Sequence, residues 1–227
     1  MKIPSKVHKY VADCKTFPGD AALSYQLTGM RGVWDALADR TTRRVVRTGH
    51  VVVFAQLLES APQVPSPAGV AIRRLTGDDW PALSKIATQR SLASFRQLAA
   101  NGRHGLVAWR GSEAIGYGWV AEQLGPDVTA CPIDLPPYAA YLWDLYVVPA
   151  ERSNGVGSAL ASARVQLARG LGFKEGWRMI APSNNASLRT LAKTGTDTRV
   201  IGELRFVKVF SRVRAQFTPS QPSGKLN

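Results

Sequence analysis

The chain has 227 residues, carries 29 Lys+Arg against 16 Asp+Glu for a formal charge of +13, and is 45% hydrophobic. This composition is that of an ordinary globular protein and excludes an intrinsically disordered chain. Only Cys14 and Cys131 are present, which argues against a disulfide framework and favours a reducing, cytoplasmic compartment. The longest apolar run, Val51–Ala55, is far shorter than the roughly 20 residues of a membrane span. No apolar segment follows the basic N-terminal residues, so no signal peptide is expected.

The excess of basic charge suggests an anionic partner, such as nucleic acid, a phosphorylated cofactor, an acidic substrate or a membrane surface. It is spread along the chain, because 9 basic and 5 acidic residues lie in 1–68, and 20 basic and 11 acidic residues follow. The densest basic groups are Arg43, Arg44 and Arg47, and further on Arg199, Arg205, Lys208, Arg212 and Arg214. No Cys/His metal finger and no basic-aromatic pattern typical of single-strand binding accompanies them. The charge alone therefore assigns no partner, and no metal is expected.

The chain begins with a predicted helix and strand. Apolar residues at helical spacing predict helix between residues 21 and 47, and Gly29 and Gly32 leave open whether it is one helix or two. A β-rich run predicts a strand over His50–Leu58. The Pro-rich residues 62–67 then predict a stiff, extended linker, which is the best candidate for a domain boundary.

After the linker, predicted strands and helices are mixed. An alternating strand at Val70–Leu75 precedes a helix that Thr76 caps and that runs towards Thr88. The further predicted elements are a helix at Ser91–Ala100, hairpin strands at Gly105–Trp109 and Ala114–Glu122, a loop at Gly125–Pro137, a strand at Tyr141–Val148, a helix at Gly155–Gly170, a strand at Trp177–Ala181, a helix at Ala186–Thr194 and a strand at Ile201–Val213. This order indicates an α/β protein without internal repeats.

The segment that indicates chemistry is residues 152–157, where Arg-Ser-Asn-Gly-Val-Gly leads from a buried strand into a helix. A helix N-terminus leaves about four N–H groups unpaired and carries roughly half a positive charge, so it attracts an anion. Gly155 and Gly157 let the backbone approach that anion closely. Arg152 adds a cation and Ser158 a hydroxyl group. The sequence therefore predicts a pyrophosphate cradle built from main chain.

This segment differs from two common nucleotide-binding motifs. No Lys follows its second Gly, as the Walker motif requires, and no third Gly follows at the spacing of the dinucleotide-binding motif. The pattern V-x-P-x-x-R-x-x-G-x-G over residues 147–157 instead resembles the acetyl-CoA-binding motif of the GNAT acyltransferase superfamily. The order of predicted elements over residues 69–211 is similar to that family as well.

The resemblance implies an α/β fold, with a GNAT-type central mixed β-sheet flanked by helices and an N-terminal helix-strand extension. The expected division is an extension over residues 1–68, the acyltransferase domain over 69–213, and a polar, disordered tail over 214–227. The extension is expected to pack on the main domain, with coverage of the acceptor cleft or formation of a homodimer as alternatives.

The resemblance also implies that acetyl-CoA, or another acyl-CoA, is the co-substrate. Residues 184–195 resemble the family's second motif, in which an Asn reaches the pantetheine arm; Asn184 fits this place best, and Asn184 and Asn185 alternatively cap the following helix. The backbone of Val147 or Val148 would supply the oxyanion donor. The expected cofactor-binding residues are Val147, Val148, Arg152, Ser153, Asn154, Gly155, Val156, Gly157, Ser158, Asn184, Asn185 and Ser187.

Three residues are candidates for proton transfer. Asp144 and Glu122 are the carboxylates best placed to act as base on an amine that is protonated at pH 7. Strand alternation predicts that Asp144 shares a face with Tyr146 and Val148, although Asp144 could instead be a buried carboxylate paired with a basic neighbour. Many family members place a Tyr, which protonates the departing thiolate, where this chain has Leu191. Tyr146 or a water molecule would then take that role.

The leading hypothesis is an acetyl-CoA-dependent N-acetyltransferase, in which the primary amine of a small molecule attacks the thioester directly. The basic charge keeps open an acceptor on an anionic macromolecule, either a protein or a charged tRNA. A long-chain acyl donor also fits, because the loop would contact only the pantetheine-phosphate end of the donor. Leu191 motivates an alternative of another class, a non-catalytic CoA-binding or regulatory module.

Overall fold

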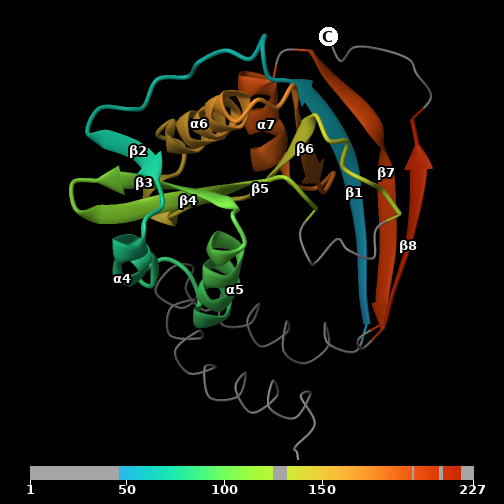
Figure 1. The fold of residues 1–227 in the computed structure, drawn as a ribbon, viewed down its shortest axis with the longest axis horizontal. Helices are drawn as coiled ribbons and strands as arrows, with labels where there is room; N and C mark the ends of the chain where they lie inside the picture. The colour runs from blue at the N-terminus through green and yellow to red at the C-terminus, as the bar shows by residue number, and fades with distance from the viewer. Residues whose placement is uncertain (1–45, 125–131, 196, 210–211, 221–227) are drawn as a thin grey trace, which may run out of the picture.

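The computed structural model describes residues 46–124, 132–195, 197–209 and 212–220 (Figure 1). Almost all of the helix predicted between residues 21 and 47 lies outside these ranges, as does part of the predicted loop at Gly125–Pro137. Within the described ranges, no helix is both long and apolar enough to cross a membrane.

The described strands form one 8-stranded sheet in the order β2-β3-β4-β5-β6-β1-β7-β8. All neighbours in it are antiparallel except β5 and β6, which are parallel. The strands are β1 (Val46–Leu57), β2 (Val70–Arg74), β3 (His104–Arg110), β4 (Glu113–Ala121), β5 (Ala139–Val147), β6 (Glu175–Ile180), β7 (Thr198–Val209) and β8 (Arg212–Pro219), and the helices are α4 (Trp80–Leu83), α5 (Gln89–Ala100), α6 (Val156–Gly170) and α7 (Asn185–Thr194). This mixed sheet with flanking helices confirms the predicted fold class.

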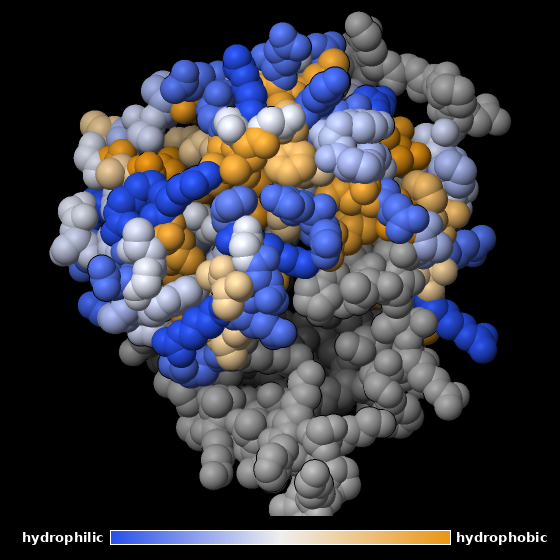
Figure 2. All heavy atoms as spheres, viewed as in Figure 1, coloured by the Kyte–Doolittle hydropathy of each residue, from blue (hydrophilic) through white to orange (hydrophobic). Residues whose placement is uncertain are grey.

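Helices cover both faces of the sheet, with α6 and α7 on one side and α4 and α5 on the other (Figure 1). On the α5 side, Leu92 and Phe95 are buried against Val107 and Trp119 of the hairpin β3–β4. On the α6 side, a second buried cluster comprises Val70, Leu106, Ala108, Ile115, Val147, Val156 and Leu160. Burial of each large apolar side chain contributes roughly 1.5–3 kcal/mol. Figure 2 shows mostly hydrophilic side chains over the described surface in this view, with apolar residues exposed between them.

The strand that precedes the predicted domain boundary, β1, belongs to the same sheet as the strands that follow it. β1 pairs with both β6 and β7, and Val53 lies opposite Met179 on one side and Gly202 on the other. Val53 is fully buried, so β1 is an interior strand. The Pro-rich run 62–67 is held on α6, because the Val64 N–H donates to the Ser162 hydroxyl at 2.9 Å. A boundary at residue 68 therefore cuts through one sheet.

The C-terminal residues correct a second prediction. Arg212–Pro219 form β8, antiparallel to β7, where the sequence analysis expects a polar, disordered tail from residue 214. Ala215 and Phe217 pack against the cluster that includes Leu204, while the alternating residues Arg214, Gln216 and Thr218 are exposed. The alternation of apolar and polar residues, rather than the overall polarity of the segment, decides its structure.

The helix predicted from Thr76 towards Thr88 is interrupted. A 3-10 turn at Gly77–Asp79 leads into α4, which ends at Leu83. Thr88 instead caps α5, and its hydroxyl oxygen accepts the Ser91 N–H at 3.2 Å. The first predicted helix is therefore shorter than expected, and α5 corresponds to the helix predicted at Ser91–Ala100.

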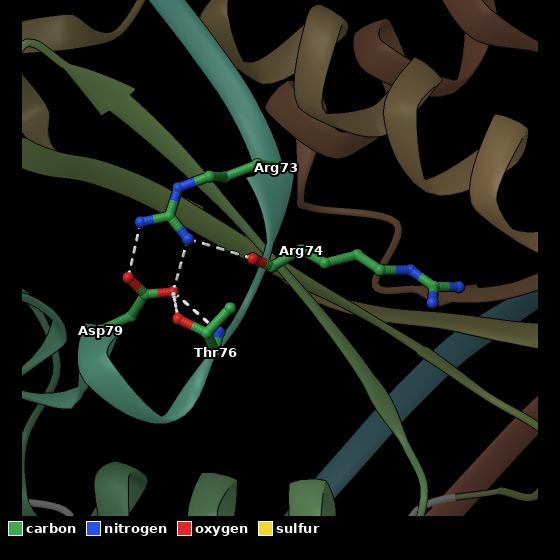
Figure 3. A network of polar contacts seen from close by, with 4 residues as sticks. All are labelled: Arg73, Arg74, Thr76 and Asp79. Atoms are coloured by element: carbon green, nitrogen blue, oxygen red, sulfur yellow. Dashed lines mark hydrogen bonds and ion pairs between the residues drawn. The ribbon is translucent and has the colours of Figure 1, made fainter.

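A carboxylate network holds the end of β2 against the start of α4 (Figure 3). The buried Asp79 accepts two hydrogen bonds from the Arg73 guanidinium, at 2.6 and 2.8 Å. It also accepts the Thr76 N–H at 2.7 Å and the Thr76 hydroxyl at 3.0 Å. These donors stabilise the charged carboxylate, so they lower the pKa of Asp79, the Arg73 hydrogen bonds most strongly.

We expect Asp79→Asn to lower the free energy of unfolding by about 1–3 kcal/mol at pH 7, because it removes charge-assisted hydrogen bonds from a buried site. A carboxyl group with a lowered pKa stabilises the fold above its unfolded value near 4, and that contribution is lost as the pH falls through the folded pKa. Urea unfolding at pH 7 and pH 3 should therefore show a difference from the unmutated protein that shrinks in acid. The exposed neighbour Asp78, changed to Asn, is the matched control, and an equal effect of both substitutions would contradict this account.

Candidate active site at the open edge of β5

The predicted cradle lies where β5 leads into α6. A 3-10 turn at Pro149–Glu151 follows the strand, and the exposed residues 152–155 precede the first residue of the helix. Ser153 and Gly155 have positive φ angles of 66° and 83°. Left-handed residues of this kind turn successive N–H groups into an anion-binding concavity. The N–H groups of the first turn of α6 add to it, since they have no acceptor within the helix.

Arg152 lies beside the cradle with its side chain folded back over β5. Its Nε donates to the Val147 carbonyl oxygen at 3.0 Å, and its guanidinium lies 5.7 Å from the centre of the Tyr146 ring. The guanidinium is therefore fixed at the end of β5, next to the N-terminus of α6, and both contribute positive potential there.

The parallel strands β5 and β6 separate soon after they meet. They pair only from Ala139–Tyr141 to Glu175–Trp177. Beyond this point a cavity of about 390 Å³ opens between them, lined by Tyr141, Leu142, Trp143, Asp144, Leu145, Arg164, Arg178, Met179, Ile180, Ser187 and Thr190. The second half of β5 therefore has one edge bonded to β4 and one edge directed towards the cavity and the cradle.

The backbone of β5 distinguishes the two oxyanion donors that the sequence predicts. The Val148 N–H donates to the Ile115 carbonyl oxygen at 3.0 Å and is engaged within the sheet. Val147 lies opposite Gly116. Because successive N–H groups of a strand point to opposite edges, the Val147 N–H points away from β4, towards the open edge. Of the two predicted donors, the Val147 N–H is thus the one that is directed towards a ligand at the open edge.

A β-bulge changes the predicted orientation of Asp144. Tyr117 lies opposite Tyr146 and Trp119 opposite Trp143, so two residues of β5 face the single residue between them on β4. Asp144 lies in this bulge and has a positive φ of 47°. The bulge shifts the alternation by one residue, and the prediction that Asp144 shares a face with Tyr146 and Val148 is wrong. Tyr146 packs with the α5-side cluster, whereas Asp144 lines the cavity.

The other two candidates for proton transfer lie elsewhere. The Tyr146 ring stacks on Tyr117 with centroids 5.4 Å apart, and burial raises the pKa of its hydroxyl while Arg152 opposes that shift. Glu122 is exposed just beyond the end of β4 and does not line the cavity. Its charge instead acts on the His104 imidazole, whose pKa burial lowers. The structure therefore does not bring Asp144, Tyr146 and Glu122 together.

The second motif forms α7, at the far wall of the cavity. The Asn184 side-chain oxygen accepts the Ser187 N–H at 3.1 Å, which makes Asn184 the N-cap of this helix. Asn185 is exposed at the first position of α7, and Ser187 lines the cavity. Leu191 is buried against Phe54 and does not line the cavity.

Two lining residues were missed by the sequence analysis, namely Arg164 on α6 and Arg178 on β6. Both are buried, with 3% and 4% of their surface exposed. Their sequence contexts, Ser-Ala-Arg-Val and Trp-Arg-Met-Ile, place an arginine among small or apolar residues of a predicted helix and strand. A charged residue at a core position is the signal that could have found them.

The comparisons with known proteins agree with this fold. A model of the acetyltransferase (GNAT) family matches residues 70–195. A search of curated proteins finds no match. Among solved structures, a Drosophila protein is 18% identical with a TM-score of 0.55, and the alignment covers 81% of this chain and 68% of that one.

Two further structural neighbours carry acetyltransferase names. A GCN5-related N-acetyltransferase from Sphaerobacter thermophilus is 15% identical with a TM-score of 0.53, over 78% of this chain and 56% of that one. A GCN5-related glucosamine N-acetyltransferase region of a fungal β-N-acetylglucosaminidase is 11% identical with a TM-score of 0.54, over 76% of this chain and 22% of that one. These likenesses concern the fold. Because the family model covers more than half of the 227 residues, the chain belongs to the GNAT family of acetyltransferases.

Proposed function

We propose that the protein transfers an acyl group, most simply acetyl, from acyl-CoA to the primary amine of a small molecule. The observation that carries this proposal is the common open edge of β5, along which the anion-binding cradle at residues 152–157 and the cavity between β5 and β6 both lie. A donor held by its pyrophosphate at the cradle would extend along this edge, with its reactive end towards the cavity.

The residues at this edge fit such a donor. The backbone of the cradle supplies N–H groups for the pyrophosphate, and the exposed loop leaves them accessible. Gly157, the second residue of α6, has no side chain, so the pyrophosphate can approach the backbone there. Arg152 adds positive charge at the end of β5. On the opposite wall, the Asn184 amide and the Ser187 hydroxyl can meet the polar groups of the pantetheine arm. The remaining predicted contacts are Ser153, Asn154, Gly155, Val156, Ser158 and Asn185.

In the proposed reaction, the amine nitrogen bonds to the acyl carbon and the carbon–sulfur bond breaks. One proton leaves the nitrogen and one reaches the thiolate. The Val147 N–H donates to the carbonyl oxygen as negative charge develops on it. Asp144, which lines the cavity, accepts the amine proton directly or through water. A water molecule, rather than the Tyr146 hydroxyl outside the cavity lining, protonates the thiolate, which is a tolerable leaving group because the pKa of a thiol is about 8.5. No role is proposed for Glu122.

The direct test is thiol release from acetyl-CoA with a panel of amines, together with the thermal shift that acetyl-CoA produces. A folded protein that shows neither would refute the proposal. Binding without thiol release with any amine would favour a non-catalytic CoA-binding module. Transfer only to bulk tRNA or protein, weakening steeply with salt, would replace the small acceptor by a macromolecular one. Longer acyl-CoA donors belong in the same panel.

Gly157→Ala should weaken acetyl-CoA binding by about tenfold or more, because a methyl group would stand among the N–H groups that approach the pyrophosphate. The fold should not suffer, since the added Cβ would meet only Val147 Cγ2 at 3.8 Å, and Ala favours a helix over Gly. Gly170→Ala, at the other end of α6 with nothing within 4 Å of the added Cβ, is the matched control. Equal acetyl-CoA affinities of the two variants in calorimetry would argue against this placement of the donor.

Asn184 should act both as helix cap and as ligand contact. We expect Asn184→Ala to lower the free energy of unfolding by about 1 kcal/mol, and Asn184→Ser to preserve it because serine also caps helices. Asn184→Ser removes the amide donor, so it should still bind acetyl-CoA several-fold more weakly. Asn185→Ala, one residue along the chain, controls for stability. If Asn184→Ser binds acetyl-CoA as tightly as the unmutated protein, the residue serves only as a cap.

A further inference from the structure

Two buried arginines from different elements meet at the cavity between β5 and β6. Arg164 comes from the face of α6 that packs on the sheet. Arg178 is the first residue of β6 beyond its last pair with β5. Burying a guanidinium is costly unless its charge and its N–H groups are satisfied. Each guanidinium therefore needs hydrogen-bond acceptors and a compensating negative charge.

Several donor groups of the two guanidinium groups have no hydrogen-bond partner among the residues that the structure describes. Arg164 Nη1 donates to the Trp143 carbonyl oxygen at 3.0 Å, and Arg178 Nη1 donates to the Thr194 hydroxyl at 3.3 Å. Arg164 Nε and both Nε and Nη2 of Arg178 are buried without an acceptor among the described residues. An unpaired buried donor is destabilising. The presence of three such donors at one cavity therefore indicates that a ligand supplies the acceptor.

The unpartnered atoms of Arg178 have the geometry of a carboxylate site. Elsewhere in the protein, Nε and Nη2 of Arg110 hold both oxygens of the Glu151 carboxylate, at 2.7 and 2.8 Å. In Arg178 the same two atoms, Nε and Nη2, have no acceptor among the described residues. Two parallel N–H groups match the two oxygens of a carboxylate, and such charge-assisted, bidentate pairs are strong and specific.

The charge of the cavity favours an anion as well. Among its lining residues, Arg164 and Arg178 are cationic, Asp144 is the single carboxylate, and the others are uncharged. Burial and, to a smaller extent, the charge of Arg178 lower the pKa of Arg164 to about 9, although Asp144 opposes the shift. Burial likewise lowers the pKa of Arg178 to about 10. A second negative charge would bring the formal charge of the lining from +1 to zero and relieve this repulsion.

We infer that Arg178, assisted by Arg164, binds a carboxylate of the substrate in this cavity. The inference rests on the proposed acyl transfer, because the cavity lies where acyl group and amine would meet. The carboxylate belongs either to the acyl donor, as in a dicarboxylic acyl-CoA, or to the acceptor, as in an amino acid. The chemistry recognised is the same in both cases.

Two experimental arms separate these sources. The donor arm compares succinyl-CoA with butyryl-CoA, which have acyl chains of the same length and differ in the terminal carboxylate. The acceptor arm compares amino acids with their neutral carboxamides, with acetyl-CoA as donor. We expect the unmutated protein to prefer the carboxylate partner in one arm by a factor on the order of 100 in kcat/KM, because the neutral partner lacks the charge-assisted hydrogen bonds to Arg178.

Arg178→Met should reduce that preference to about one, since methionine keeps the length of the side chain without its fork of donors. Arg178→Lys should lose most of it, because it retains the charge but not the paired Nε and Nη2. Arg169→Met, an exposed arginine of α6, should retain it. The preference is a ratio measured within each variant, so a smaller folded fraction does not change it.

A ratio near one in both arms for the active, unmutated protein would overturn the inference and leave the proposed function intact. A preference that survives in Arg178→Met would overturn it too, and would indicate that Asp144 alone compensates the pair. If no thioester binds or is turned over, the proposed function fails. The inference is then decided by calorimetry with succinate and succinamide: binding of succinate alone, lost in Arg178→Met, supports it, and its absence overturns it.

Discussion

The short pairing of β5 with β6 is the constraint on which the site depends. Parallel strands ordinarily satisfy each other's backbone groups along their length, but here only Ala139–Tyr141 meet Glu175–Trp177. The bulge at Asp144 adds local twist at the point where the strands have parted. What holds the two strands in place lies outside their own ladder: β4 and α6 pack on β5, and β1 pairs with β6. The open edge of β5 is therefore supported by the rest of the sheet, not by its neighbour.

Gly118 links this bulge to the buried cation. It lies between Tyr117 and Trp119, opposite the two bulge residues 144 and 145 of β5. A Cβ added to it would come within 2.8 Å of Arg164 Cδ. A glycine inside a strand often marks the close approach of another group. Here its bare backbone gives the stem of Arg164 room to cross β4, so that the guanidinium reaches the Trp143 carbonyl and the cavity. The bulge, the glycine and the arginine form one arrangement.

The sequence predicts the parts of this arrangement that follow from local rules. The hairpin, the glycine-containing turn after β5 and the cap at Asn184 each depend on neighbours in the chain, and the structure has them near the predicted residues. The sequence does not predict the bulge, because Tyr141–Val148 has the pattern of one continuous apolar strand. Only the pairing with β4 shows the extra residue. Pairing across distant segments likewise places β1 inside the sheet. Patterns within one segment carry no information of that kind.

The basic charge of the protein is distributed in an unusual way between surface and interior. At the surface, Arg73, Arg110 and Arg199 each bond a carboxylate although they are about half exposed. Water would solvate these arginines in any case, so the arginines themselves gain little from their acceptors. In two of the three pairs the benefit falls to the buried carboxylate, Asp79 or Glu175. In the interior, where an acceptor matters most, Arg164 and Arg178 keep donors that find no acceptor in the described part of the chain. A protein selected only for stability would reverse this allocation or replace the buried pair by apolar residues. The destabilisation that these donors cause is relieved when an anion enters the cavity, so the same groups that weaken the empty protein favour the bound one.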